Sequence, residues 1–193
     1  MRNLLLEIHD RNAFRKWLFE NGETERECWL HVKRGEPTDD DHFWYIDAVE
    51  EALCFGWIDS IQKVVDGVYV QRFCKRQHFT PWTELDKERV RRLQKLGLMT
   101  DAGLKRFPKK QQKYILDPDI EEAIKTARIL TKYRALPPLY RRIRTAEIAS
   151  YKESRPAMFK FLLTQFIEET RAGHLYGEWD DYGRLLKDGK RTS

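Results

Sequence analysis

The dipeptide Asp66-Gly67 lies between two runs that are rich in β-branched and aromatic residues, 57–65 and 68–73. A two-residue type I′ turn needs a positive φ at both central positions, and Asp-Gly is one of the pairs that adopt it most readily. The pattern therefore predicts a β-hairpin near the middle of the chain.

Other periodic segments flank this hairpin. Residues 27–33 alternate between apolar and polar side chains, as in a strand, whereas residues 10–22 and 43–55 have the apolar spacing of helices. Later helices are signalled by a capping residue or a proline at the first helical position: Thr83, Asp117-Pro118, Pro137-Pro138 and Pro156. We expect an α+β fold in which a small antiparallel sheet, made of one strand and the hairpin, packs with helices and precedes a helical C-terminal region.

No low-complexity linker divides the chain. The expected boundary is therefore marked only by the change from a mixed pattern of strands and helices to a helical pattern. We assign residues 1–112 to an α+β domain and residues 113–193 to a helical C-terminal region packed on it as one compact unit. Within the helical region, one helix is expected from Asp117 to about Lys132. A length of 193 residues fits a single domain with such an extension.

Composition favours a soluble protein of a reducing compartment. Hydrophobic residues make up 41% of the chain and aromatic residues 12%, which is enough apolar mass for a packed core. The run Leu4–Leu6 is too short for an export signal, and no stretch has the ~18 apolar residues of a membrane span. Three cysteines without a CxxC pair argue against a disulfide framework. We expect a cytoplasmic protein with no membrane partner.

The hairpin suggests a ligand site. With a two-residue turn, cross-strand partners have numbers that sum to 133, so Asp59 should face Cys74 and Trp57 should face Arg76. Asp59 would then lie between Arg72 and Arg76 on one face of the hairpin. Two guanidinium groups around one carboxylate suit a small anionic ligand, and an indole could stack on a ring. The predicted ligand-binding residues are Trp57, Asp59, Arg72, Arg76 and Trp82.

The same set could instead be a structural Arg–Asp–Arg triad that closes the end of the sheet, and the sequence leaves both interpretations open. We expect Arg76, near the open end of the hairpin, to serve a ligand rather than the fold. An enzyme that uses the same pocket is an alternative, but no catalytic residue is assigned.

The string Glu51-Ala52-Leu53-Cys54-Phe55-Gly56-Trp57-Ile58-Asp59, followed by Arg72-Phe73, Arg76, Trp82 and Gly97-Leu98-Met99, resembles the YdeI/OmpD-associated family, also called bacteriocin-protection proteins. The resemblance spans about residues 10–107. It implies a bacterial cytosolic α+β protein without an assigned biochemical activity. The chain departs from the family pattern at Ser60, Cys74 and Asp86, while both arginines are kept.

Other sites are less well supported by the sequence. The histidines have no metal-ligand spacing and no nucleotide-binding glycine motif is present, so no metal or cofactor is predicted. Glu50 and Glu51 are adjacent on a helix and should diverge, one of them facing solvent.

Charge is unevenly distributed along the chain. Residues 1–60 hold 7 basic and 14 acidic residues (net −7), whereas residues 125–160 hold 10 basic and 2 acidic residues (net +8). Nucleic-acid binding through the basic C-terminal helices is therefore an alternative function. Its candidate residues are Arg134, Arg141, Arg144 and Lys152.

Overall fold

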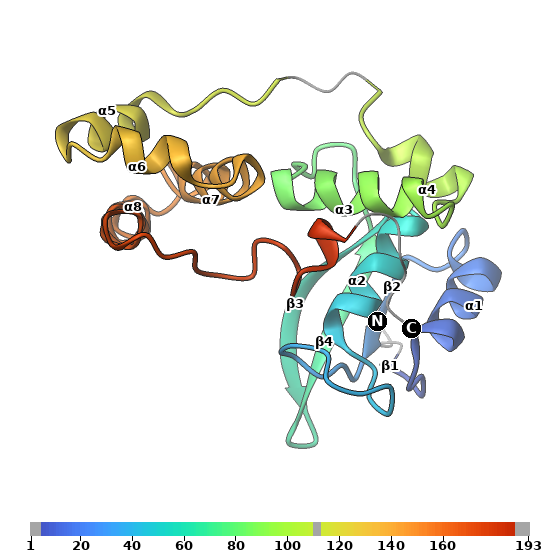
Figure 1. The fold of residues 1–193 in the computed structure, drawn as a ribbon. Coiled ribbons are helices and arrows are strands. Elements are labelled where there is room, and N and C mark those ends of the chain that lie inside the picture. The colour runs from blue at the N-terminus through green and yellow to red at the C-terminus, as the bar shows by residue number, and fades with distance from the viewer. Residues whose placement is uncertain (1–4, 110–112, 188–193) are drawn as a thin grey trace. The chain divides into compact units, whose positions relative to one another are not determined.

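The structure is a computed structural model that describes residues 5–109 and 113–187. Within these residues the fold is α+β, with eight α-helices and one sheet of four strands (Figure 1). The predicted fold class is therefore confirmed.

The sheet contains one strand more than expected. Its strands are β1 (Leu5–Leu6), β2 (Glu27–Leu30), β3 (Trp57–Val65) and β4 (Val68–Lys75), in the order β1-β2-β4-β3. Strand β1 runs parallel to β2, and the other two pairs are antiparallel, so the sheet is mixed. Two residues carry too little alternation to signal a strand, which is why β1 is absent from the prediction.

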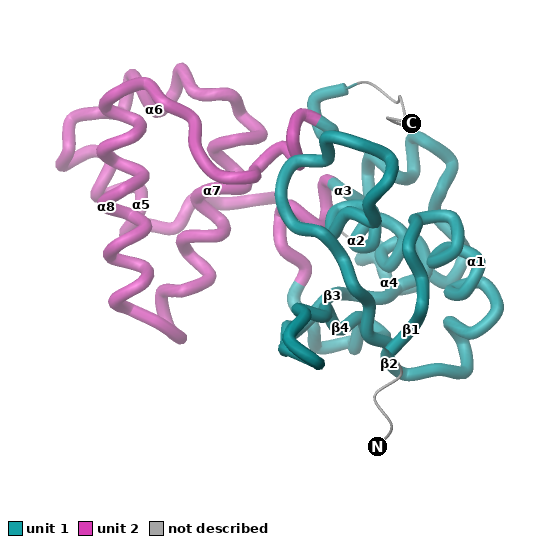
Figure 2. Tube along the Cα trace, turned by 90° about the horizontal axis from the view of Figure 1, so that it is seen from below, with its two compact units in different colours: residues 1–81, 89–110, 184–193 teal, residues 82–88, 111–183 magenta. Residues whose placement is uncertain are grey.

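The chain forms two compact units (Figure 2). Unit 1 contains residues 1–81, 89–110 and 184–193, and unit 2 contains residues 82–88 and 111–183. This division differs from the expected one at two segments, because residues 82–88 belong to unit 2 and the segment after residue 183 belongs to unit 1.

The helices are distributed over both units. Unit 1 contains α1 (Arg11–Asn21), α2 (Tyr45–Cys54), α4 (Asp101–Arg106) and the 3₁₀ helix η1 (Arg184–Leu186). Unit 2 contains α5 (Pro118–Thr126), α6 (Leu130–Ala135), α7 (Pro138–Ser150) and α8 (Pro156–Ala172). Helix α3 (Glu84–Lys95) begins in unit 2 and continues in unit 1.

Side-chain caps begin several helices where the sequence predicts them. The Asp10 carboxylate accepts the N–H of Ala13 at 2.8 Å, and the Thr83 hydroxyl accepts the N–H of Asp86 at 3.0 Å. Each cap satisfies a backbone donor that has no partner within the helix.

The helix expected from Asp117 to Lys132 is divided in two. Helix α5 starts at its Asp117 cap but ends at Thr126, and α6 begins at Leu130. Between them Arg128 has a φ of 55°, in the left-handed region that ends a helix. An arginine gives no sequence signal for this conformation, so the prediction of one helix was wrong.

In unit 1, α1 packs on the face of the sheet that presents Phe73. The Phe14 ring lies 5.5 Å from the Phe73 ring, and both residues are fully buried. Trp17 contacts Trp57 edge to face at 5.7 Å. These aromatic contacts position the start of β3 under α1.

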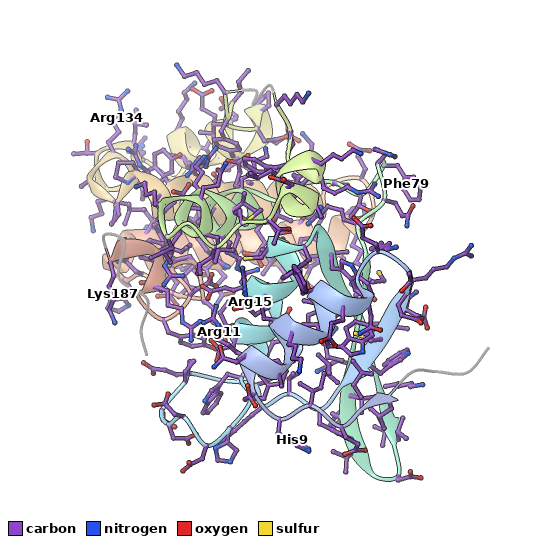
Figure 3. The ribbon with its side chains drawn as sticks, turned by 90° about the vertical axis from the view of Figure 1, so that its right-hand side faces the viewer. His9, Arg11, Arg15, Phe79, Arg134 and Lys187 are labelled. Carbon is purple, nitrogen blue, oxygen red and sulfur yellow. The ribbon has the colours of Figure 1, made fainter. Side chains whose placement is uncertain are left out.

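A network of charged side chains joins α1 and α2. The Arg11 guanidinium donates to Glu51 at 2.6 Å, to Glu50 at 2.9 Å and to Asp47 at 3.1 Å. Arg15 donates to the second oxygen of Glu51 at 2.7 Å, and Figure 3 shows both arginines on the side of α1 that faces α2. Burial alone would lower the pKa of Arg11, but the adjacent carboxylates raise it above its ordinary value.

Two further arginines complete this network from distant parts of unit 1. Arg92 on α3 donates to Glu50 at 2.6 Å, and Arg184 in η1 donates to Asp47 at 2.8 Å and to Glu50 at 3.2 Å. Glu50 and Glu51 are 1% and 0% exposed, so the expectation that one of them faces solvent was wrong. Adjacent carboxylates can share one environment here because arginines approach α2 from three other elements.

The core of unit 2 is built around Tyr140 on α7. Its ring contacts Phe166 of α8 at 6.2 Å and Trp179 at 5.3 Å, and the three side chains are buried. Arg142 on the same helix donates to Glu84 at 3.0 Å, which ties the first turn of α3 to α7 within this unit.

Candidate functional site

The hairpin has the predicted turn. Asp66 and Gly67 have φ values of 50° and 80°, as a type I′ turn requires. Val65 pairs with Val68, and Lys63 pairs with Val70. The predicted register is therefore confirmed for the half of the hairpin next to the turn.

The register changes in the other half of the hairpin. A β-bulge between Asp59 and Gln62 adds one residue to β3, so Asp59 pairs with Phe73 and Trp57 pairs with Lys75. The predicted pairs of Asp59 with Cys74 and of Trp57 with Arg76 were wrong. Because side chains alternate along a strand, Asp59 lies on the face of Phe73, and Arg72 lies on the opposite face.

Two of the predicted site residues are in the core of unit 1. Trp57 is 1% exposed, and its indole N–H donates to the carbonyl of Gly22 at 3.2 Å. Arg76 is also 1% exposed, and its guanidinium donates to the carbonyl of Pro81 at 2.8 Å. The expectation that Arg76 serves a ligand at the open end of the hairpin is not supported, because its side chain is enclosed.

Arg72 has an environment of its own within the sheet. Arg72 donates to Glu27 of β2 at 3.0 Å and to the Ser60 hydroxyl at 3.2 Å. The hydrogen bond from Arg72 lowers the pKa of Glu27 below its ordinary value. Trp82 belongs to unit 2. Within unit 1, the structure does not bring Asp59 and Arg72 together, because they lie on opposite faces of the hairpin.

A different set of polar side chains surrounds Asp59. The Tyr45 hydroxyl, at the start of α2, donates to the Asp59 carboxylate at 2.6 Å. The Arg34 guanidinium lies over the Tyr45 ring, 3.8 Å from its centre, and donates to the Gln71 side-chain carbonyl at 2.7 Å. We call Arg34, Tyr45, Asp59 and Gln71 the Arg34 cluster.

Gln71 connects the Arg34 cluster to the bulge. Its side chain is 1% exposed, and its amide N–H donates to the carbonyl of Ile61 at 3.3 Å. Ile61 is one of the two bulge residues, whose backbone leaves the regular ladder. Continuous contacts therefore lead from the bulge through Gln71 and Arg34 to Tyr45 and Asp59.

Electrostatics keep Tyr45 protonated. Burial raises the pKa of its hydroxyl far above the ordinary value, and the Asp59 carboxylate raises it further. Arg34 and Arg89 act in the opposite direction on this pKa and are weaker. Tyr45 is therefore a hydrogen-bond donor to Asp59 at any physiological pH.

Arg34 differs from the arginines of this chain that form ion pairs with carboxylates. Carboxylates pair with Arg11, Arg15, Arg72, Arg92, Arg142 and Arg184. In the part of the chain that the structure describes, no carboxylate pairs with Arg34, although its side chain is held by Tyr45 and Gln71. Arg34 is exposed, so its remaining guanidinium N–H groups can reach a ligand.

Little in the sequence indicates this cluster. Arg34 precedes Gly35 at the start of a polar loop, where basic residues are common. Gln71 is a polar residue within the predicted strand 68–73, but only the structure shows that it is buried and therefore needs hydrogen-bond partners.

The basic residues considered for nucleic-acid binding are largely engaged within unit 2. Arg144 is 7% exposed and donates to Glu147, and Lys152 forms an ion pair with Asp119 at 2.8 Å. Arg141 lies over the Tyr133 ring at 5.3 Å. Of the four predicted residues, only Arg134 is exposed to solvent, as nucleic-acid binding would require (Figure 3).

Residues 5–109 and 113–187 contain neither a cluster of metal ligands nor a membrane-spanning helix. No group of three or more histidine, cysteine, aspartate or glutamate side chains in these ranges could hold a metal ion. Within the same ranges, no helix has the length and apolar character that a membrane span needs.

A family model described as a domain of unknown function, DUF8412, matches residues 6–106, just over half of the 193-residue chain. The chain therefore belongs to this family. The match includes β2, β3 and β4, the helices α1 to α4 and all four residues of the Arg34 cluster. No curated protein matches the chain, and no solved structure matches it either.

Proposed function

We propose that this member of the DUF8412 family binds a small ligand with a carboxylate or phosphate group at the Arg34 cluster. The observation that carries the proposal is the environment of Arg34, an exposed guanidinium that is held in place without a carboxylate partner among the described residues. Guanidinium groups bind planar or tetrahedral oxyanions through two parallel N–H donors.

Arg34 is held in one orientation by its neighbours. The Tyr45 ring covers one face of the guanidinium, and Gln71 accepts from one terminal nitrogen at 2.7 Å. Gln71 is itself fixed by the bulge, and Tyr45 by its hydrogen bond to Asp59. Orienting a flexible arginine in advance reduces the entropy that is lost when a ligand binds.

The charge around the cluster also favours an anion. Arg34 and Arg89 both act on the Tyr45 hydroxyl as positive charges, and Asp59 acts as the negative one. Arg34 supplies the positive charge of the cluster, whereas Arg72, which the sequence predicted beside Asp59, pairs with Glu27. The ligand would bind at the guanidinium N–H groups of Arg34 that Gln71 does not occupy.

The proposal includes a cytoplasmic location and the resemblance to the YdeI/OmpD-associated family. Cys28, Cys54 and Cys74 are free thiols, which supports a reducing compartment. Asp59 is the last residue of the string that carries the resemblance, and it lies in the cluster.

Thermal unfolding in the presence of phenyl phosphate, benzoate or inorganic phosphate tests this function. We expect at least one of these anions to raise the melting temperature in a saturable manner, and Arg34→Gln to abolish the increase. The free variant is its own reference, because loss of the bond to Gln71 lowers its melting temperature. Arg134→Gln, which removes an exposed arginine of unit 2, is the matched control and should keep the response. An equal loss of response in both variants would indicate nonspecific binding and would contradict the proposal.

A further inference from the structure

The loop that follows β4 presents a single aromatic side chain to solvent. Phe79 is 84% exposed, and Figure 3 shows it extending outward from the molecule. It lies in a turn in which the N–H of Thr80 donates to the carbonyl of Gln77 at 3.1 Å. The Phe79 ring is outside the core, so its faces are open to contact with a ligand.

Arg76 fixes the base of this turn. Its backbone N–H donates to the carbonyl of Gly56 at 3.0 Å, and its buried guanidinium donates to the carbonyl of Pro81 at 2.8 Å. Burying an arginine is costly unless its N–H groups are satisfied, and here one of them bonds to the loop backbone. The turn that carries Phe79 is thus held at its base by a side chain from the interior.

The surroundings of Phe79 are basic. Arg106, at the end of α4, lies 3.5 Å from the ring nitrogen of His78, and Lys105 and Lys109 next to it in the chain are exposed. The segments 67–81 and 102–109 of unit 1 contain no acidic residue. The charge on this part of unit 1 therefore complements a polyanion.

We propose that this loop and the end of α4 form a surface that binds single-stranded nucleic acid. An exposed aromatic ring among cations is the arrangement on which unpaired bases stack while phosphates meet basic side chains. A single phenylalanine between the polar residues Gln77, His78 and Thr80 offers too little apolar surface to anchor a protein in a bilayer. The surface is distinct from the Arg34 cluster and does not depend on the function proposed there.

Fluorescence anisotropy with labelled 15-nucleotide poly-dT and poly-U, on the full-length protein, tests the proposal. We expect binding that Phe79→Ala weakens about tenfold, within the range reported for the loss of one stacked base. Phe19→Ala is the matched control, because Phe19 is 79% exposed on α1, and it should leave binding unchanged. Circular dichroism would establish that both variants are folded.

The salt dependence tests the basic residues separately. Replacing Lys105 and Lys109 by glutamine should reduce the slope of log K against log salt by about 0.7 for each lost phosphate contact. No binding to either oligonucleotide, or equal losses in Phe79→Ala and Phe19→Ala, would overturn the proposal. Phe79-dependent binding to phosphatidylglycerol vesicles, without binding to the oligonucleotides, would also overturn it and would assign the surface to a membrane.

Discussion

Arg184 donates to Asp47 at 2.8 Å, and the two residues are 137 positions apart in the chain. The same guanidinium donates to Glu50 at 3.2 Å, and Arg184 is only 6% exposed. The contact attaches η1 to α2 within unit 1. It also supplies the fourth arginine of a network that balances three largely buried carboxylates.

Arg184→Ala should destabilise the protein by about 3 kcal/mol, the lower part of the range for breaking a buried ion pair. Asp47 and Glu50 both keep Arg11 as a partner, which limits the loss. Urea unfolding of the full chain measures the effect, with the exposed Lys187→Ala as the control. A change below 1 kcal/mol would show that the remaining arginines satisfy the carboxylates.

Gln71→Met should cost about 2 kcal/mol, because it leaves the Ile61 carbonyl at the bulge without its donor. The matched control is Gln62→Met on the opposite strand, since Gln62 pairs with Gln71 but is exposed. Its effect should stay within about 0.5 kcal/mol. Equal free energies of unfolding for the two variants would mean that the Gln71 amide does not stabilise the bulge.

Arg128→Gly should stabilise the protein by about 0.5–1 kcal/mol, because glycine adopts a φ of 55° without the steric cost that arginine carries. The same replacement inside α6, Arg134→Gly, should instead destabilise it by up to about 1 kcal/mol. Chemical unfolding of the two variants should therefore give changes of opposite sign. Destabilisation by both would indicate that residue 128 is not left-handed in solution.

Stability should depend on Tyr140 at alkaline pH. Burial raises the pKa of its hydroxyl to about 12 from an ordinary value of 10, so the unfolded chain loses this proton first. The contribution of Tyr140 is complete below pH 10 and decreases as the pH rises from 10 to 12.

Unfolding free energies of the wild type and of Tyr140→Phe, measured from pH 7 to pH 11, test this dependence. At pH 7 the variant should be equally stable or slightly more stable, because no described residue makes a hydrogen bond of ordinary geometry with the Tyr140 hydroxyl. The advantage of the variant should grow above pH 10. A difference that is constant with pH would contradict the raised pKa.

Features that depend on a few neighbouring residues could be predicted from the sequence. The Asp66-Gly67 turn and the caps at Asp10 and Thr83 were correct, because each depends on the conformational preference or hydrogen bond of one local side chain. The strands β3 and β4 and the fold class were also predicted correctly. The residue pattern of each strand lies within one short segment of the sequence.

Features that depend on contacts between distant segments could not be predicted. At the bulge, the Gln71 amide donates to the Ile61 carbonyl. The alternation of apolar and polar residues along a strand does not predict such a contact. One added residue reversed the faces of Asp59 and Arg72 and removed the predicted site. Glu50 and Glu51 are both buried because arginines from α1, α3 and η1 reach α2, and the sequence shows only that the two carboxylates are adjacent.

The order of the two units along the chain has a consequence for synthesis on the ribosome. All of residues 111–183, which form most of unit 2, are made between the strands of unit 1 and Arg184. Domains commonly fold in the order in which they emerge, N-terminal first. Unit 1 cannot follow this order to completion, because Asp47 and Glu50 gain the last arginine of their network only after the helices of unit 2 have been translated.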